Sequence, residues 1–185
     1  LHKSQLEAAC QTVLDRWGNI DILVNAAGGT TPEGSVPVDK TIFDMSLDAM
    51  RYVIDLNLIG TLLPCQVFGS SMAAKGEGCI VNVSSLAVPR AVTRAVAYSA
   101  GKAAMENFTR WLAVELALKF GGGLRVNAIA PGFFVGDQNR QLLLNDDGSL
   151  TQRGQRIIEH TPAGRFGSPE ELVGALIWLC SRSAT

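Results

Sequence analysis

The sequence predicts an α/β fold in which a doubly wound parallel sheet carries helices on both faces. Short apolar runs of strand length alternate with longer segments whose apolar residues recur at helical spacing, and Gly- or Pro-containing breaks separate them. Strands separated by helices form right-handed crossovers, which make neighbouring strands parallel. The chain has 185 residues, 47% of them hydrophobic, so we expect one core and a single domain over 1–185.

The chain begins with a predicted helix and a predicted strand. Apolar residues recur at helical spacing from Gln5 to Trp17, and Gly18 ends the pattern. The apolar run 20–25 then predicts the first strand. Residues 28–41 are rich in Gly, Thr and Pro, which is typical of a loop.

The middle of the chain predicts one long helix and a buried strand. Helical periodicity continues from about 46 to 74, and Gly76 and Gly78 end this single predicted helix. The apolar run 79–84 then predicts a second strand that ends in hydroxyl residues. A loop that contains Pro89 follows it.

The last third predicts two more helices around a third strand. A helix over 98–120 ends at three consecutive glycines, and the run 124–130 predicts the strand. A long polar segment follows. The final helix is expected over 169–180, because Ser168 precedes a proline and two glutamates follow it.

Composition excludes several classes of protein. The net charge is −1 and no basic stripe is visible, so we expect no nucleic-acid partner. The four cysteines include no C-x-x-C pair and there are only two histidines, so we expect neither a metal site nor a disulfide framework. Reduced thiols favour a cytoplasmic location. The longest apolar stretches fall short of a membrane span and no amino-terminal signal pattern is visible, so we expect no membrane association.

Tyr98 and Lys102 are four residues apart on a predicted helix, and this spacing is the strongest chemical signal in the chain. Residues i and i+4 share a helix face, so the ammonium can lie beside the phenol. A nearby positive charge favours the phenolate and makes the phenol usable as a proton donor and acceptor. The pair alone also fits an ordinary solvated helix face.

Other polar or small residues follow predicted strands and so define a possible site. In parallel sheets, ligands bind beyond the carboxyl ends of the strands. Gly28, Ser85 and Pro131 each follow such an end, and Tyr98 begins the helix after the second strand. Either Ser84 or Ser85 could hold a substrate oxygen by a hydrogen bond. We therefore expect these residues to converge on one crevice.

The ordered set Asn57, Ser85, Tyr98 and Lys102 resembles the short-chain dehydrogenase/reductase family. The segment Asn25-Ala26-Ala27-Gly28 and the later Pro131-Gly132 are part of the same resemblance. It implies a Rossmann-like sheet and a carbonyl/alcohol oxidoreductase. It also implies that Tyr98 transfers the proton, that Ser85, at the family's spacing from Tyr98, holds the substrate oxygen, and that Asn57 anchors a water in a proton relay.

The resemblance further implies a nicotinamide cofactor, NAD or NADP. Lys102 is implied to reach the ribose hydroxyls, and Asn25 to tie neighbouring strands together. Relatives commonly carry Thr about where Gly136 stands. The implied cofactor-binding residues are Asn25, Ala26, Ala27, Gly28, Tyr98, Lys102, Pro131, Gly132, Phe134 and Val135.

Family members begin with a strand and a Gly-rich turn that hold the cofactor pyrophosphate, and these 185 residues contain no such turn. The chain also stops before the family's last strand. We therefore expect an internal fragment with a partial sheet. The choice between NAD and NADP stays open.

Loop segments within 136–167, the expected substrate segment, resemble members described as D-mannonate oxidoreductase or fructuronate reductase and, more loosely, gluconate 5-dehydrogenase. This implies a small sugar-acid substrate such as fructuronate or mannonate. Its carboxylate needs a cation, and Arg94 or Arg140 could supply it, although both could equally be solvated.

A second class of function also stays open. The chain could be a truncated, non-catalytic remnant that serves as an assembly or binding module. In the family, helices corresponding to 46–74 and 98–120 commonly pack against a partner subunit, which implies a homodimer or homotetramer. Their apolar residues are equally explained as contacts with the sheet.

Overall fold

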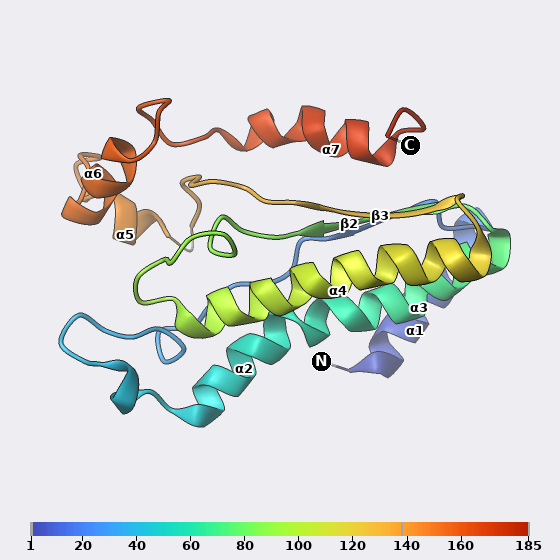
Figure 1. The fold of residues 1–185 in the computed structure, drawn as a ribbon, viewed down its shortest axis with the longest axis horizontal. Coiled ribbons are helices and arrows are strands. Elements are labelled where there is room, and N and C mark those ends of the chain that lie inside the picture. Colours follow the sequence, from blue (N-terminus) through green and yellow to red (C-terminus); the bar gives the residue numbers. More distant parts are fainter. Residues whose placement is uncertain (1, 138, 185) are drawn as a thin grey trace.

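The computed structural model describes residues 2–137 and 139–184, and these residues contain one three-stranded parallel sheet with helices on both faces (Figure 1). The strands lie in the order β1-β2-β3, with Asn25 opposite Asn82 and Val83 opposite Ile129. The predicted fold class is confirmed. The strand bounds are β1 (Ile22–Asn25), β2 (Gly78–Val83) and β3 (Leu124–Ile129).

Helices cover the two faces of the sheet unequally. In Figure 1, α7 lies on one side of the sheet, while α1, α3 and α4 lie on the other. The helix α2 packs against α4 beyond the end of the sheet. The bounds are α1 (Lys3–Trp17), α2 (Leu47–Asn57), α3 (Ile59–Lys75), α4 (Val96–Phe120) and α7 (Val173–Cys180).

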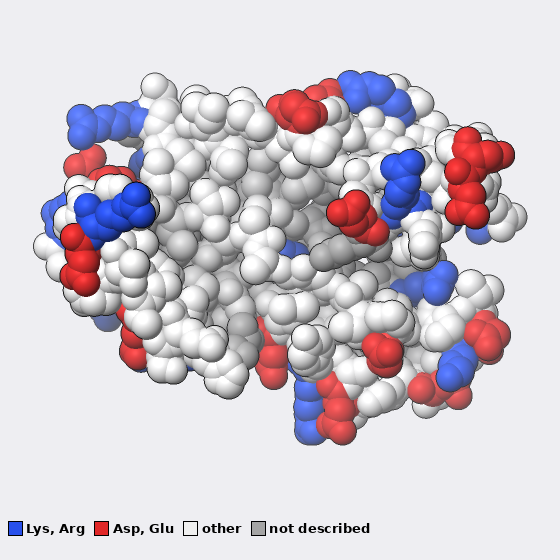
Figure 2. Space-filling view, turned by 180° about the vertical axis from the view of Figure 1, so that it is seen from behind, with Lys and Arg blue, Asp and Glu red and all other residues white. Residues whose placement is uncertain are grey.

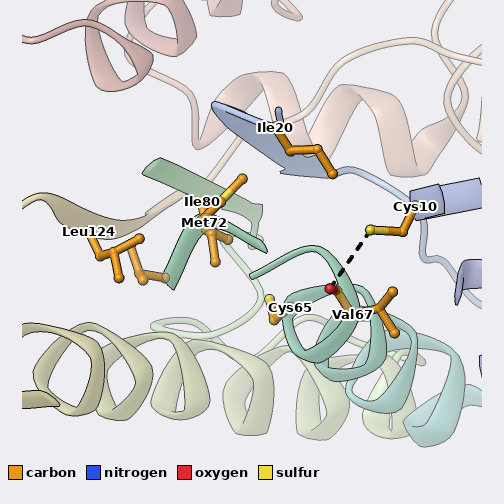
Figure 3. Packing of buried hydrophobic residues seen from close by; sticks show 8 residues of the cluster. Cys10, Ile20, Cys65, Val67, Met72, Ile80 and Leu124 are labelled. Atoms are coloured by element: carbon orange, nitrogen blue, oxygen red, sulfur yellow. Dashed lines mark hydrogen bonds between the residues drawn. The ribbon is translucent and has the colours of Figure 1, made fainter. Parts of the chain in front are cut away.

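The hydrophobic core lies between β1–β3 and the helices α1 and α3 (Figure 3). Met72 of α3 and Ile80 of β2 are almost fully buried at its centre. The Cys10 thiol of α1 donates to the carbonyl oxygen of Val67 at 4.0 Å, which joins α1 to α3. Burial of these side chains supplies the main stabilising term.

The predicted single helix over 46–74 is wrong, because the structure contains two helices that meet at Leu58. The Thr61 backbone N–H donates to the Leu58 carbonyl at 3.1 Å. The Thr61 hydroxyl donates to the Asn57 carbonyl at 3.0 Å. A side chain thus replaces a regular helical bond at the junction. Pro64, which has no N–H, lies in the second turn of α3.

The expectation that no apolar stretch reaches the length of a membrane span needs correction. Residues 47–75 together form a helical segment of 29 residues that is long and apolar enough to cross a membrane by length and composition. A third of its most apolar window is buried, and α3 contacts α1, β1 and β2. A core helix meets the same criterion, so this feature is weak evidence for membrane insertion.

The segment 136–167 is more regular than the sequence suggested. It contains the short helices α5 (Arg140–Leu143) and α6 (Gln152–Glu159), and its last residue returns to the turn after β3, where the Gly167 N–H donates to the Phe133 carbonyl at 2.9 Å. The predicted helix 169–180 begins as a 3₁₀ turn, with Ser168 and Glu171 forming a capping box. The remaining elements are η1 (Ile42–Asp44) and η2 (Pro169–Leu172).

Charged side chains are interspersed on the face shown in Figure 2. Basic and acidic groups alternate around its margin, and a broad uncharged area lies between them. This face therefore presents no basic stripe of the kind that binds a nucleic-acid backbone. The expectation of no nucleic-acid partner stays a prediction.

Candidate active site

A cavity of about 370 Å³ lies beyond the carboxyl ends of the strands and beside the first turns of α4. This is where ligands bind in open parallel sheets. Its walls come from the loops after β1, β2 and β3, from α4 and from the segment 136–167. The predicted site residues that line it are Ala26, Gly28, Ser85, Arg94, Tyr98, Lys102, Pro131 and Gly132.

Tyr98 and Lys102 lie side by side in this cavity, as the i,i+4 spacing predicted. The Lys102 Nζ atom is 5.8 Å from the centre of the Tyr98 ring and donates to the Val83 carbonyl at 2.6 Å. Lys102 is only 5% exposed, and this burial lowers the pKa of its ammonium. The ammonium carries three donors, and in the described residues only the bond to Val83 is made.

The two serines after β2 point to different partners. Ser84 is buried, and its hydroxyl donates to the Glu106 carboxylate of α4 at 2.9 Å. The Ser85 Oγ instead accepts the Ala87 N–H at 3.1 Å, which leaves the Ser85 proton for another acceptor. Both residues line the cavity, and this difference favours Ser85 as the donor to a substrate oxygen.

Asn57 lies beneath the cavity and is not part of its lining. Its side-chain amide donates to the carbonyls of Gly29 and Val53, both at 2.7 Å, and its Oδ1 accepts the Gly29 N–H at 3.1 Å. A Cβ at Gly28 would lie 2.8 Å from that Oδ1 atom, so only glycine allows this approach. Asn57 thus fixes the loop after β1.

Asn25 also lies behind the cavity, in a buried hydrogen-bond network. Its amide donates to Asn82 Oδ1 at 2.9 Å and to Cys65 Sγ at 3.3 Å, and Asn82 in turn donates to Thr109 Oγ1 at 2.8 Å. Burial raises the pKa of the Cys65 thiol to about 12, so this thiol stays protonated. The network joins β1, β2 and α4 near the carboxyl ends of the two strands, next to the cavity.

The turn after β3 contributes Pro131 and Gly132 to the cavity, whereas Phe134 and Val135 lie outside its lining, as does Ala27. The Gly136 N–H donates to Asn139 Oδ1 at 2.8 Å, and the Asn139 amide donates to the Phe134 carbonyl at 2.7 Å. Asn139 lines the cavity, although nothing in the sequence pattern singled it out.

Of the two arginines that the sequence suggested, Arg94 lines the cavity and Arg140 does not. The Arg94 Nε donates to the Val36 carbonyl at 2.9 Å. Arg140 is exposed on α5 and is not part of the cavity lining. Arg153 of α6 lines the cavity in its place, and its Nη1 donates to Thr93 Oγ1 at 3.3 Å. The only sequence signal for it was Thr151, a possible helix cap two residues earlier.

Comparison with known proteins assigns the chain to a family. The family model described as Enoyl-(Acyl carrier protein) reductase matches residues 2–185. An uncharacterized oxidoreductase of Bacillus subtilis, UxuB, is 41% identical over 99% of this chain and 68% of its own length. The chain belongs to the short-chain dehydrogenase/reductase family. Members of this family are NAD(P)-dependent oxidoreductases, so the expected family, enzyme class and cofactor class are confirmed at that level.

Solved structures of the family share this fold closely. A protein of Haemophilus influenza, provisionally described as a D-mannonate oxidoreductase and solved with NAD, is 38% identical with a TM-score of 0.89. It is covered over 68% of its length, and this chain over 100%. A gluconate 5-dehydrogenase of Burkholderia cenocepacia, solved with NADP and tartrate, is 31% identical with a TM-score of 0.84, over 99% of this chain and 66% of its own length. The chain thus spans about two thirds of the length of these relatives.

The residues present fit the nicotinamide and ribose end of the family's cofactor. The free N–H groups of Lys102 face a cavity whose walls at Ala26, Gly28 and Gly132 are small enough to admit a ring close to the backbone. The described part of the chain contains no cluster of three or more His, Cys, Asp or Glu side chains that could bind a metal ion.

Proposed function

We propose that this chain carries the catalytic centre of an NAD(P)-dependent oxidoreductase that interconverts a carbonyl and a secondary alcohol on a sugar acid such as D-fructuronate or D-mannonate. The convergence of Ser85, Tyr98 and Lys102 on one cavity at the strand ends is the observation that supports the reaction type. The substrate class is supported by the relative described as a D-mannonate oxidoreductase and by the relative solved with tartrate, a dicarboxylate.

Each catalytic candidate has a role that its surroundings allow. When bound, the nicotinamide supplies or accepts the hydride. Tyr98 gives its phenolic proton to the carbonyl oxygen in reduction and removes a proton in oxidation, and Ser85 donates a hydrogen bond to the same oxygen. The Lys102 ammonium beside the ring stabilises the tyrosinate, and its remaining N–H groups hold the ribose hydroxyls.

Asn57 contributes mainly by fixing the backbone at Gly29. Both of its amide protons are already used by the carbonyls of Gly29 and Val53. The anchoring of a relay water therefore falls to the Asn57 main-chain carbonyl, which accepts the Thr61 hydroxyl and has a second lone pair.

The proposal includes a homo-oligomer formed through α2–α3 and α4. Trp111, Val114 and Leu118 form an apolar stripe on α4, and their exposed fractions reach 80% at Leu118. Tyr52 of α2, which packs against α4, is 58% exposed. Exposed apolar patches of this kind mark protein–protein contacts. The thiols Cys10, Cys65, Cys79 and Cys180 are free, which fits the proposed cytoplasmic location.

The alternative, a non-catalytic remnant, has less support. A chain released from selection for catalysis has no reason to keep Ser85, Tyr98 and Lys102 in one cavity with the lysine buried beside the phenol. The apolar stripe on α4 serves assembly in either case, so it does not favour the remnant.

Substitution of Tyr98 by Phe tests the proposal. This change removes the transferred proton and keeps the ring, so we expect kcat for the reduction of D-fructuronate to fall about 10²- to 10⁴-fold. Substitution of Tyr52, the other tyrosine, by Phe is the matched control and should leave kcat within about twofold. Undiminished turnover in the Tyr98→Phe variant would overturn the assignment.

A further inference from the structure

Two arginines from different parts of the chain face the cavity that contains Tyr98. Arg94 lies in the loop before α4, and Arg153 lies in the first turn of α6. Arg153 bonds to Thr93, the neighbour of Arg94, so the two guanidinium groups belong to one corner of the cavity. Partial burial and, as a smaller cause, the charge of Arg94 lower the pKa of Arg153, as expected for two cations at one corner of a cavity.

No acidic side chain compensates these charges in the part of the chain that the structure describes. The cavity lining contains no Asp or Glu, and neither arginine takes part in an ion pair. Four other arginines do have such partners, for example Arg110 with Glu106 and Arg165 with Glu171. Arg153 is half-buried, whereas Arg94 is exposed. A partly buried cation without a carboxylate is costly unless an anion joins it.

The backbone holds both arginines in place at some cost. Arg94 has a φ of 71°, the only positive φ outside glycine among the described residues, and the Val36 N–H donates to its carbonyl at 2.9 Å. Such sparsely populated conformations cluster at ligand-binding sites. On the other side, Gly154 packs so closely on α5 that a Cβ would lie 2.3 Å from the Leu143 carbonyl oxygen. This close packing fixes the helix that carries Arg153.

We infer that Arg153 and Arg94 together bind the carboxylate of the substrate, and that Arg153 is the main determinant of specificity for an acid over its neutral counterpart. The inference rests on the proposed function for the identity of the reaction. A guanidinium presents a planar fork that matches a carboxylate, and two such groups fix both the position and the orientation of the anion. The carbonyl at the other end of the substrate would then lie toward Ser85 and Tyr98.

Paired substrates separate this role from a general effect on the fold. D-fructuronate and D-fructose differ in a carboxylate against a hydroxymethyl group. In the Arg153→Met variant we expect KM for D-fructuronate to rise about 10- to 100-fold, with kcat/KM for D-fructose changed less than about threefold. The variant Arg153→Lys keeps the charge and loses the planar fork, so its KM for D-fructuronate should lie between those of the unsubstituted protein and Arg153→Met.

Matched variants provide the controls. Arg156 is an exposed arginine on the same helix outside the cavity. Arg156→Met should therefore leave KM and kcat/KM for both substrates within about twofold of the unsubstituted protein. Arg94→Gln should show a selective loss for the acid in the same direction but smaller than that of Arg153→Met, which keeps the inference testable if one variant folds poorly. Equal losses for both substrates would overturn it. So would a rise in KM for NADH or NADPH alone, since the arginines would then serve the cofactor phosphates.

A binding measurement makes the inference independent of turnover. Calorimetric titration of the Tyr98→Phe variant with D-mannonate and with its neutral counterpart D-mannitol should show tighter binding of the acid by about tenfold or more. Adding Arg153→Met should remove that preference. If the unsubstituted protein reduces neither sugar, the proposed function fails while this titration still decides the inference. Equal binding of acid and polyol would overturn it.

Discussion

The two sides of the active-site cavity are built in different ways. The floor, formed by the strand ends and α4, holds Tyr98 and Lys102 on a regular helix and Ser85 two residues after β2. The cover, segment 136–167, contributes Asn139, Leu142 and Arg153 from short helices and turns. The residues proposed to carry out the reaction lie on the floor, and the cations proposed to select the substrate lie at its junction with the cover. A scaffold that holds the reacting side chains on a helix and at strand ends can change its substrate specificity by changes in the cover alone.

Side chains of the floor are more deeply buried than those of the cover. Asn82, Lys102 and Thr109 on the floor side are 5% exposed or less. Among the described residues of the cover, only Leu143 and Gly154 are buried. Changes on the floor should therefore cost more than chemically similar changes in the cover.

The largest effect is expected at Lys102. Lys102→Met keeps the side-chain volume and removes the charge beside Tyr98, so kcat should fall about 100-fold or more. Because a buried charge is also removed, the free energy of unfolding at neutral pH should be unchanged or higher by about 1–2 kcal/mol. Activity assays and thermal melts test both. A strong loss of stability would contradict the view that burial of this ammonium is a cost.

The pH dependence of stability checks the same point. Burial lowers the pKa of Lys102 below its ordinary value of 10.5. Between the folded and unfolded pKa values the unfolded chain binds the extra proton, so the unfolding free energy rises with pH in that window. Below the pKa of Lys102 in the folded chain, the cost of burying its ammonium lowers the unfolding free energy in full. In Lys102→Met this rise should be absent from melting curves recorded on the alkaline side up to pH 10.5.

The next effect in size compares two hydrogen-bonded asparagines. Asn82→Ala leaves the Asn25 amide and the Thr109 hydroxyl buried without this partner, and should lower the free energy of unfolding by about 2–4 kcal/mol. Asn145 of the cover bonds to Ser149 but is exposed, so Asn145→Ala should cost about 0.5 kcal/mol. Urea unfolding measures both. Equal costs would remove the contrast between floor and cover.

A smaller effect is expected at the cap of α6. The Thr151 hydroxyl accepts the Gly154 N–H at 3.0 Å and donates to the Leu142 carbonyl at 2.7 Å, so it joins α5 to α6. Thr151→Ala should cost about 1 kcal/mol, confined to the cover. Hydrogen exchange should quicken in residues 152–159 and stay unchanged in β2. Faster exchange in β2 would show that cover and floor unfold together.

The smallest effect is expected at Arg140. It is exposed and outside the cavity, so Arg140→Ala should change the free energy of unfolding by less than about 0.5 kcal/mol and KM for D-fructuronate less than about twofold. Steady-state kinetics test this directly. A selective rise in KM for the acid would show that α5 turns inward when substrate binds, and that the sequence-based choice of Arg140 was sound.

The sequence predicted the floor well and the cover poorly. The i,i+4 relation of Tyr98 and Lys102 and the placement of Ser85 after a strand follow from fixed helix and strand geometry. The break of the helix at Leu58 could not be read from periodicity, because one side chain, Thr61, replaces a backbone bond there without disturbing the apolar pattern. Arg153 was missed because the polar segment that carries it shows no periodicity over most of its length.

The sequence by itself determined the fold class, the parallel direction of the strands and the pairing of a phenol with an ammonium, since all of these rest on local periodicity and on the handedness of the chain. Tertiary structure alone decided which serine is free to donate, that Asn57 is occupied by the Gly29 backbone, and which arginine reaches the cavity. Those outcomes depend on contacts between residues far apart in the chain, which no local pattern encodes. Tyr98 could be found by counting residues, whereas Arg153 could be found only by folding the chain.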